Sequence, residues 1–152
     1  MTPLSPADCY HVGLVVPDLD SAITEMTAAG AYSWTKPVEA TLKITTDDGD
    51  IDMPFRFVYS IEAPHLELIS AVPGTIWTAR ADGAAHHLGY WVDDLHGTAA
   101  RLEAAGFRCE ARPASPQLSS FAYYISQSGV RIEIVDRALF PDWPGFLAAM
   151  KA

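Results

Sequence analysis

The sequence has few cysteines and no long hydrophobic run, and each shortage excludes a class of protein. Its 152 residues include only Cys9 and Cys109, too few for a disulfide framework, so we expect packed thiols rather than a bridge or a nucleophile. No stretch approaches the roughly 18 uninterrupted apolar residues of a membrane span. The first residues, MTPLSP, lack the basic flank and apolar run of a signal peptide. We therefore expect a cytoplasmic protein that does not interact with membranes.

Basic residues are also scarce. Ten Lys and Arg stand against 19 Asp and Glu, which gives a net charge of −9. Proteins that bind nucleic acid need a dense cationic surface, so we expect no nucleic-acid partner. The same scarcity counts against a polyphosphate ligand such as coenzyme A, unless a local arginine cluster holds it. Hydrophobic residues make up 49% of the chain, which is enough to fold one ordinary domain without disulfides.

The most informative feature of the chain is an internal repeat. The segment HVGLVVPDL at 11–19 aligns with HLGYWVDDL at 87–95, where His, Gly, Val, Asp and Leu coincide. Each half also ends in an apolar segment built around an acid, HLELI at 65–69 and RIEIV at 131–135. Matching segments that recur in the same order indicate a tandem duplication.

Both halves predict the same order of elements, βαβββ. Short β-branched and aromatic runs predict the strands, and apolar residues at helical spacing predict the helices. Asp18 or Asp20 is expected to cap the first helix, and Gly30 to end it as the C-cap. The expected strands cover 10–16, 35–45, 52–60, 64–70, 86–92, 107–113, 119–126 and 130–136, and the helices end at Gly30, at Gly106 and near Met150.

We expect the whole chain, 1–152, to form a single domain of two modules. Module 1 covers about 9–71, a connector 72–85, module 2 about 86–137, and a helical tail 138–152. In the tail, Trp143, Phe146 and Leu147 can pack either across a dimer interface or on the chain's own sheet. The sequence leaves these two possibilities open.

The repeat places four metal-ligand candidates at equivalent positions. His11 and His87 open the first strand of each half, and Glu67 and Glu133 lie in the middle of the last. Taken singly, such residues are more often hydrogen-bonded core histidines and solvent-facing glutamates. Each glutamate, however, is flanked by Leu or Ile, where a buried carboxylate is costly unless it is paired or bound to a cation. Two imidazoles and two carboxylates suit a divalent ion that keeps open coordination positions.

Several further side chains are expected near these residues because alternate residues of a strand share a face. Trp91 shares the face of His87, while His65 and Arg131 share the faces of the two glutamates. Two aromatic rows are either core under a helix or the wall of a pocket for a largely apolar substrate. The rows are Phe55, Phe57 and Tyr59 on one strand and Phe121 and Tyr123 on another. The expected substrate-binding residues are Trp91, Arg131, His65, Phe57, Tyr59 and Tyr123.

The paired βαβββ plan, with His-x-Gly openings and glutamates in the closing strands, resembles the vicinal oxygen chelate superfamily. This group includes glyoxalase I, methylmalonyl-CoA epimerase, extradiol dioxygenases and bleomycin-binding proteins. The resemblance covers about residues 10–135 and implies an α+β fold, in which two tandem modules form a curved, cup-shaped mixed sheet around a metal site. His11, Glu67, His87 and Glu133 match the four ligand positions. The implied cofactor is one divalent ion (Zn, Ni, Co, Mn or Fe), and the implied assembly is a homodimer.

The resemblance also implies a function, that of a metal-dependent isomerase, epimerase or lyase acting on a small, mainly hydrophobic oxygenated substrate. The metal would stabilise an enolate or enediolate, with Glu133 as the first choice of general base and Glu67 as the second. The set His-Glu-His-Glu resembles that of glyoxalase I, whereas the epimerases usually carry Gln where this chain has Glu67. The absence of an evident cationic pocket counts against lactoylglutathione and long acyl-CoA substrates.

Two alternatives of different classes remain at this point. The first is a non-catalytic protein that binds a drug or metabolite, although family members of that kind typically lack the metal ligands. The second is a metal-dependent dioxygenase, which commonly uses three ligands in a longer chain.

Overall fold

The computed structural model describes all residues from 1 to 152, and the chain divides into two compact units. Each unit is assembled from three separate segments, so that residues close in space come from distant parts of the sequence. Unit 1 consists of Met1–Tyr10, Leu42–Met53 and His87–Pro141, and unit 2 of His11–Thr41, Pro54–His86 and Asp142–Ala152.

The chain contains both helices and strands, with parallel and antiparallel pairs, which confirms the α+β class and the βαβββ order of both halves. None of the helices combines the length and hydrophobicity that crossing a membrane requires. The strands are β1 (Cys9–Val16), β2 (Val38–Thr46), β3 (Gly49–Tyr59), β4 (Leu66–Ser70), β5 (His87–Val92), β6 (Arg108–Pro113), β7 (Phe121–Ile125) and β8 (Arg131–Asp136), and the α-helices are α1 (Leu19–Gly30), α2 (Leu95–Ala104) and α3 (Trp143–Met150).

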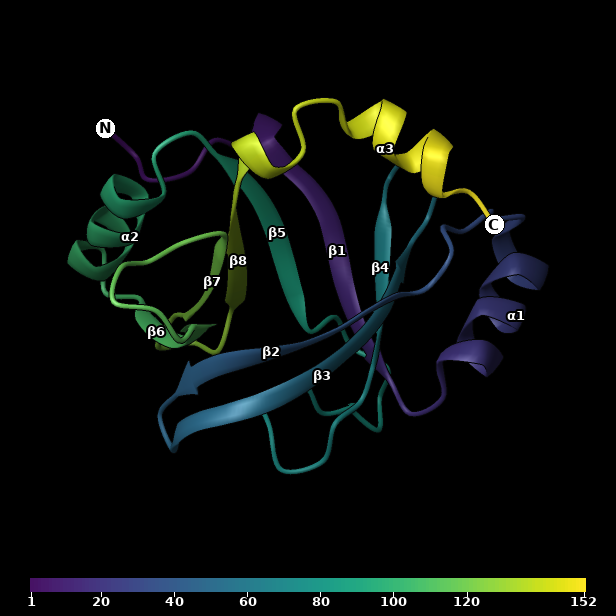
Figure 1. Ribbon diagram of the computed structural model, residues 1–152, viewed down its shortest axis with the longest axis horizontal. Helices are drawn as coiled ribbons and strands as arrows, with labels where there is room; N and C mark the ends of the chain where they lie inside the picture. Colours follow the sequence, from purple (N-terminus) through teal and green to yellow (C-terminus); the bar gives the residue numbers. More distant parts are fainter. The chain divides into compact units, whose positions relative to one another are not determined.

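Unit 1 is a mixed sheet with one helix on one face. The strand order is β2-β6-β7-β8-β5, in which β5 and β8 run parallel and the other neighbours antiparallel. Helix α2 packs beside β6, β7 and β8 (Figure 1). Its apolar stripe, which includes Leu95 and Leu102, contacts Ala122, Tyr124 and Ile134 in one buried cluster. The residues that alternate with these along β7 and β8 therefore point to the face of the sheet away from α2.

Unit 2 repeats this plan on a smaller scale. Its strand order is β1-β4-β3, with β1 and β4 parallel and β3 and β4 antiparallel. Helix α1 covers one face, where Leu19 and Ala22 pack with Trp34, Val58 and Leu68. As in unit 1, the face away from the helix carries the alternate set of side chains. We call the face of each sheet that points away from α1 or α2 its ligand face.

The helix caps confirm one prediction and correct another. Asp18 caps α1, because its carboxylate accepts a hydrogen bond of 2.7 Å from the Ser21 N–H, and this bond lowers the pKa of Asp18. The expectation that Gly30 is the C-cap is wrong. Gly30 is the last helical residue, and Ala31 adopts the left-handed conformation at φ 56°. A Cβ at Gly30 would lie 2.7 Å from the ring of Tyr32, so a larger residue there would require that ring to move.

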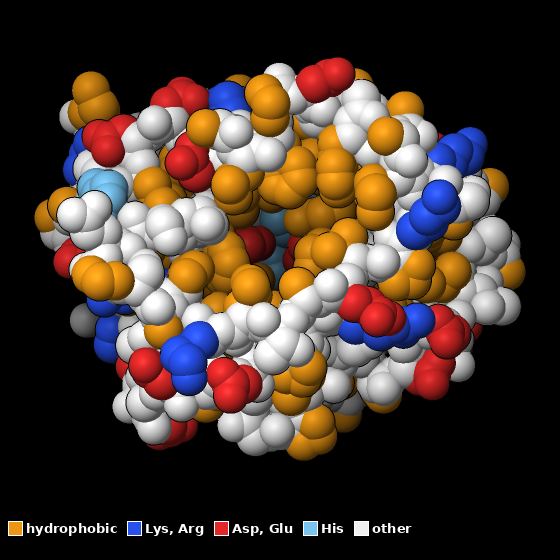
Figure 2. All heavy atoms as spheres, in the orientation of Figure 1, with side chains coloured by type: hydrophobic (Ala, Val, Ile, Leu, Met, Phe, Trp, Pro, Cys, Tyr) orange, Lys and Arg blue, Asp and Glu red, His pale blue; other side chains and the backbone are white.

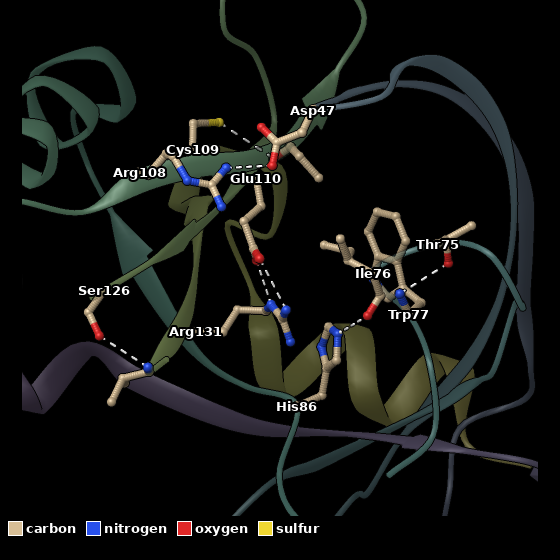
Figure 3. A network of polar contacts seen from close by, with 12 residues as sticks. Asp47, Thr75, Ile76, Trp77, His86, Arg108, Cys109, Glu110, Ser126 and Arg131 are labelled. Atoms are coloured by element: carbon tan, nitrogen blue, oxygen red, sulfur yellow. Dashed lines mark hydrogen bonds and ion pairs between the residues drawn. The ribbon is translucent and has the colours of Figure 1, made fainter. Parts of the chain in front are cut away.

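The predicted connector contains a well-packed turn. Trp77 is fully buried and meets the ring of Phe55 edge-on at 5.0 Å. The backbone N–H of Trp77 donates to the Thr75 hydroxyl, and the neighbouring Ile76 carbonyl lies 2.8 Å from Nε2 of His86 (Figure 3). The segment is therefore part of the hydrophobic core of unit 2, which its Pro and Gly content did not indicate.

The C-terminal tail packs on its own unit. Leu147 of α3 is buried, the Met150 carbonyl accepts from the Lys36 N–H at 2.7 Å, and the Ala152 N–H donates to the Trp34 carbonyl at 3.0 Å. The tail thus packs on the sheet of its own unit, and a dimer interface stays a prediction.

Candidate metal centre

The first candidate pair of ligands lies on the two parallel strands of unit 2. The register of β1 and β4 pairs Gly13 with Glu67, so the residue directly beside this glutamate has no side chain. His11, two residues earlier on the same face, brings its Nε2 to 3.6 Å from Oε1 of Glu67. The two side chains are 0% and 6% exposed. The His-x-Gly opening is therefore the local reason that an imidazole and a carboxylate meet here.

The second pair has the same construction in unit 1. The parallel strands β5 and β8 place Gly89 beside Glu133, and Nε2 of His87 lies 3.1 Å from Oε2 of Glu133. These side chains are 0% and 10% exposed. The duplication seen in the sequence is thus also a duplication of strand register and of side-chain contact.

The chemistry of the four residues suits a metal ion. One donor atom from each of His11, Glu67, His87 and Glu133 lies within 4.8 Å of the others, and all four residues are buried. A buried carboxylate requires a compensating charge, and two carboxylates with two imidazole nitrogens supply the donors that divalent transition metals accept. The residues therefore form a buried His-Glu-His-Glu group that fits a divalent ion.

A tyrosine accompanies each pair at an equivalent position. In unit 2, Tyr59 is paired with Glu67 across β3 and β4, and its ring meets the His11 ring edge-on at 5.6 Å. In unit 1, Tyr123 is paired with Glu133 across β7 and β8, and its ring meets His87 edge-on at 5.1 Å. Each imidazole is thereby held between a carboxylate and an aromatic ring.

The two aromatic rows lie on the ligand faces. Residues next to them in sequence, Val58 on β3 and Tyr124 on β7, belong to the clusters under α1 and α2, so the rows themselves point away from the helices. Neither α1 nor α2 covers the rows, although Tyr59 of the first row contacts Trp143 of α3, and their place in a pocket wall stays a prediction. Phe57 meets Tyr59 edge-on at 5.6 Å, and Phe121 meets Tyr123 at 6.0 Å.

The remaining predicted residues lie on the same faces but already have partners. Trp91 stacks on Tyr10 with ring centroids 3.6 Å apart, and its other neighbour is Phe140 at 5.6 Å. His65 has its Nδ1 at 3.1 Å from the Ser60 carbonyl. Their roles in binding a substrate stay predictions.

Arg131 is held by an acid that the sequence analysis missed. Its Nε donates to Oε2 of Glu110 at 2.6 Å and its Nη2 to Oε1 at 3.2 Å (Figure 3). The two side chains are 20% and 8% exposed. The only sequence signal for this pair is a glutamate between Cys109 and Ala111 in a strand, which does not reveal its partner. Arg131, two residues before Glu133, therefore has its positive charge balanced by the Glu110 carboxylate.

Removing the Glu110 carboxylate is expected to destabilise the protein. Glu110→Ala removes the carboxylate that accepts two hydrogen bonds from a largely buried guanidinium, and we expect a loss of about 2–4 kcal/mol in the free energy of unfolding. Urea denaturation measures this loss. The matched control is Glu39→Ala, which removes one of the two exposed carboxylates that pair with Arg56 and should cost less than about 1 kcal/mol. Equal losses in both variants would contradict a structural role for the buried pair.

Comparisons with known proteins agree with the fold and the arrangement of the strands. A family model described as the glyoxalase/bleomycin resistance protein/dioxygenase superfamily matches residues 10–124. A comparison with curated proteins found no match.

Three similar solved structures illustrate the likeness. A variant of the Streptomyces coelicolor methylmalonyl-CoA epimerase, in complex with 2-nitronate-propionyl-CoA, has a TM-score of 0.59 at 16% identity and covers 85% of this chain and 96% of that one. The Mycobacterium tuberculosis methylmalonyl-CoA epimerase gives 0.53 at 22%, covering 83% and 85%. A hypothetical protein from Bacillus halodurans gives 0.54 at 13%, covering 83% and 91%. At these identities the three structures share the fold of this chain.

Proposed function

Because the chain belongs to the glyoxalase/bleomycin resistance protein/dioxygenase superfamily, we propose that it is a metal-dependent isomerase, epimerase or lyase acting on a small, mainly hydrophobic oxygenated substrate. The observation that carries the proposal is the duplicated, buried His–Glu contact, with its four donor atoms within 4.8 Å of one another. A binding protein that only sequesters its ligand has no need of such a donor set.

The four residues His11, Glu67, His87 and Glu133 would hold one divalent ion of zinc, nickel, cobalt, manganese or iron. When bound, the ion supplies Lewis acidity that stabilises negative charge on substrate oxygens as a neighbouring carbon loses its proton. The glycines beside the two carboxylates keep this space open, and the tyrosine rings beside the two imidazoles limit how far the imidazoles can turn.

Glu133 is our choice for the general base, and Glu67 is the second choice. A carboxylate oxygen of Glu133 would accept the proton from the substrate carbon and return it at the same or a neighbouring carbon. The assignment follows the resemblance to glyoxalase I. It is also supported by the slightly greater exposure of the Glu133 side chain, since a base must reach its substrate.

The charge distribution favours an uncharged substrate over a coenzyme A ester. Five of the seven arginines already contact at least one carboxylate, namely Arg56, Arg80, Arg108, Arg131 and Arg137. On the face shown in Figure 2, Lys and Arg side chains stand in small groups and do not gather into one basic patch. A polyphosphate would therefore find few available cations, whereas the aromatic ligand faces suit apolar groups.

Metal content is the first test of the proposal. Plasma mass spectrometry on the untagged protein should find close to one equivalent of a divalent metal, and the His11→Ala/His87→Ala double variant should lose it. His96→Ala is the matched control, because this exposed histidine lies on α2 and should leave the metal content unchanged. If the wild-type protein takes up no metal even after reloading with each candidate ion, the enzyme proposal fails, and a non-catalytic binding protein becomes the working hypothesis.

A further inference from the structure

Helix α3 brings two aromatic side chains close to the first His–Glu pair. The Trp143 ring stacks on Phe146 at 5.6 Å and meets Tyr59 edge-on at 5.0 Å. Tyr59 in turn contacts the ring of His11 at 5.6 Å. Trp143 also meets His65 edge-on at 5.7 Å. A single ring therefore separates the C-terminal helix from a candidate metal ligand, although the sequence analysis placed neither Trp143 nor Phe146 in the site.

These two aromatic residues are not what fixes the helix in place. The carboxylate of Asp142 caps α3 by accepting from the Gly145 N–H at 3.0 Å, and Leu147 is the buried residue of the helix. The last turn is bound to the 34–36 segment by backbone hydrogen bonds. In Figure 1, α3 (yellow) lies near one end of β4.

Trp143 and Phe146 are only half-buried, even though they lie against the ligand face of unit 2. A tail that merely completed the core would bury its largest apolar side chains, as α3 does with Leu147. Leaving an indole partly exposed beside Tyr59 provides apolar ring surface for something else to cover.

We propose that Trp143, supported by Phe146 and Tyr59, binds a flat aromatic group of the substrate, whose vicinal oxygen atoms lie toward His11 and Glu67. This inference rests on the proposed function of the same site. Rings with centroids 4.5–7 Å apart attract one another edge-on or offset, and Trp143 already holds three neighbours in such geometry.

The test uses two chelators that differ only in the group beside the chelating oxygens. Benzohydroxamate carries a phenyl ring and acetohydroxamate a methyl group, while both offer the same pair of oxygens to a metal. Titration calorimetry on the cobalt-loaded protein should show benzohydroxamate binding about tenfold more tightly, which corresponds to roughly 1.4 kcal/mol of ring contact. Quenching of tryptophan fluorescence by benzohydroxamate provides a second readout that does not depend on turnover.

Variants at Trp143 then test whether this residue causes the tighter binding of benzohydroxamate. Trp143→Ala should reduce the ratio of the two affinities to about twofold and leave the acetohydroxamate affinity unchanged. Trp143→Phe should keep most of the ratio, because it keeps a ring. Trp143→Leu keeps apolar volume without a ring and should behave like Trp143→Ala, so the proposal stays testable if the alanine variant fails to fold. Met150→Ala, at the other end of α3, is the matched control.

The outcomes separate this inference from the proposed function. If acetohydroxamate binds the cobalt-loaded protein but the ratio is near one, or the ratio survives Trp143→Leu, the role of Trp143 is wrong and the metal site stands. If the protein takes up no cobalt, both proposals fall together.

Discussion

Glu133→Gln should lower the rate of proton exchange on the substrate by about 10²–10⁴-fold while the protein still takes up metal. The amide keeps an oxygen donor of nearly the same shape but cannot accept a proton at neutral pH. His87 lies 3.1 Å from Glu133 and would keep its own place beside Tyr123. The variant therefore separates holding a metal from moving a proton.

The measurement is incorporation of deuterium from heavy water, followed by mass spectrometry. A compound that the wild-type protein exchanges would first be selected from hydroxy-ketones, thiohemiacetals and 2-substituted acyl thioesters. Glu67→Gln is the matched comparison, because Glu67 has the same position in the other half of the repeat, and it should lose less activity. If Glu133→Gln exchanged at the wild-type rate with metal bound, the base would have to be another group. A large loss in Glu67→Gln alone would assign the role to Glu67.

The ligand candidates could be predicted from the sequence because they are duplicated. A single histidine or glutamate in a strand has several ordinary explanations, but the same pair in both halves does not. The structure supplies the physical reason for the pattern. In each half two parallel strands are aligned so that a glycine faces the glutamate, and the histidine two residues earlier points to the same side. The spacing visible in the sequence is thus the spacing of this register.

The position of the aromatic rows could be predicted only in part. Alternation along β3 shows that Phe57 and Tyr59 share a face, but it does not show which face the helix covers. That choice depends on Val58, whose side chain packs with Leu19 and Ala22 of α1. The contact joins residues far apart in the sequence, and no local pattern contains it.

The contacts of Trp77, Glu110 and Trp143 could not be predicted from the sequence, for a related reason. Trp77 lies in a segment with Pro and Gly nearby and no periodicity, yet it is fully buried against Phe55. Glu110 lies in a strand, but its partner Arg131 is on another strand of the sheet. Trp143 lies on a helix that the sequence could place on either of two surfaces. In each case the deciding contact is long-range, and a single sequence carries no signal for it.

Loading with metal and neutralising the glutamates should each stabilise the metal-free protein, and the two gains should not add. At a free metal concentration 100 times the dissociation constant, the wild-type protein should gain about 2.7 kcal/mol in its free energy of unfolding. Without metal, the Glu67→Gln/Glu133→Gln double variant should be more stable than the wild-type protein by about 1–3 kcal/mol, because it no longer buries two carboxylates without a cation. The double variant should gain much less from metal.

Urea denaturation with chelator and with saturating metal measures all four states. Glu110→Gln is the internal control, since it makes the same chemical change in a carboxylate that Arg131 already balances. This variant should be less stable than the wild-type protein in both conditions. If the double variant were also less stable in chelator, the imidazoles at 3.6 Å and 3.1 Å would already compensate the two carboxylates, and the group would be a structural network with no need of a metal. The double variant could instead be more stable than the wild-type protein in chelator and less stable than it in metal. This result would mean that the fold gives up stability at Glu67 and Glu133 to keep a cation site ready.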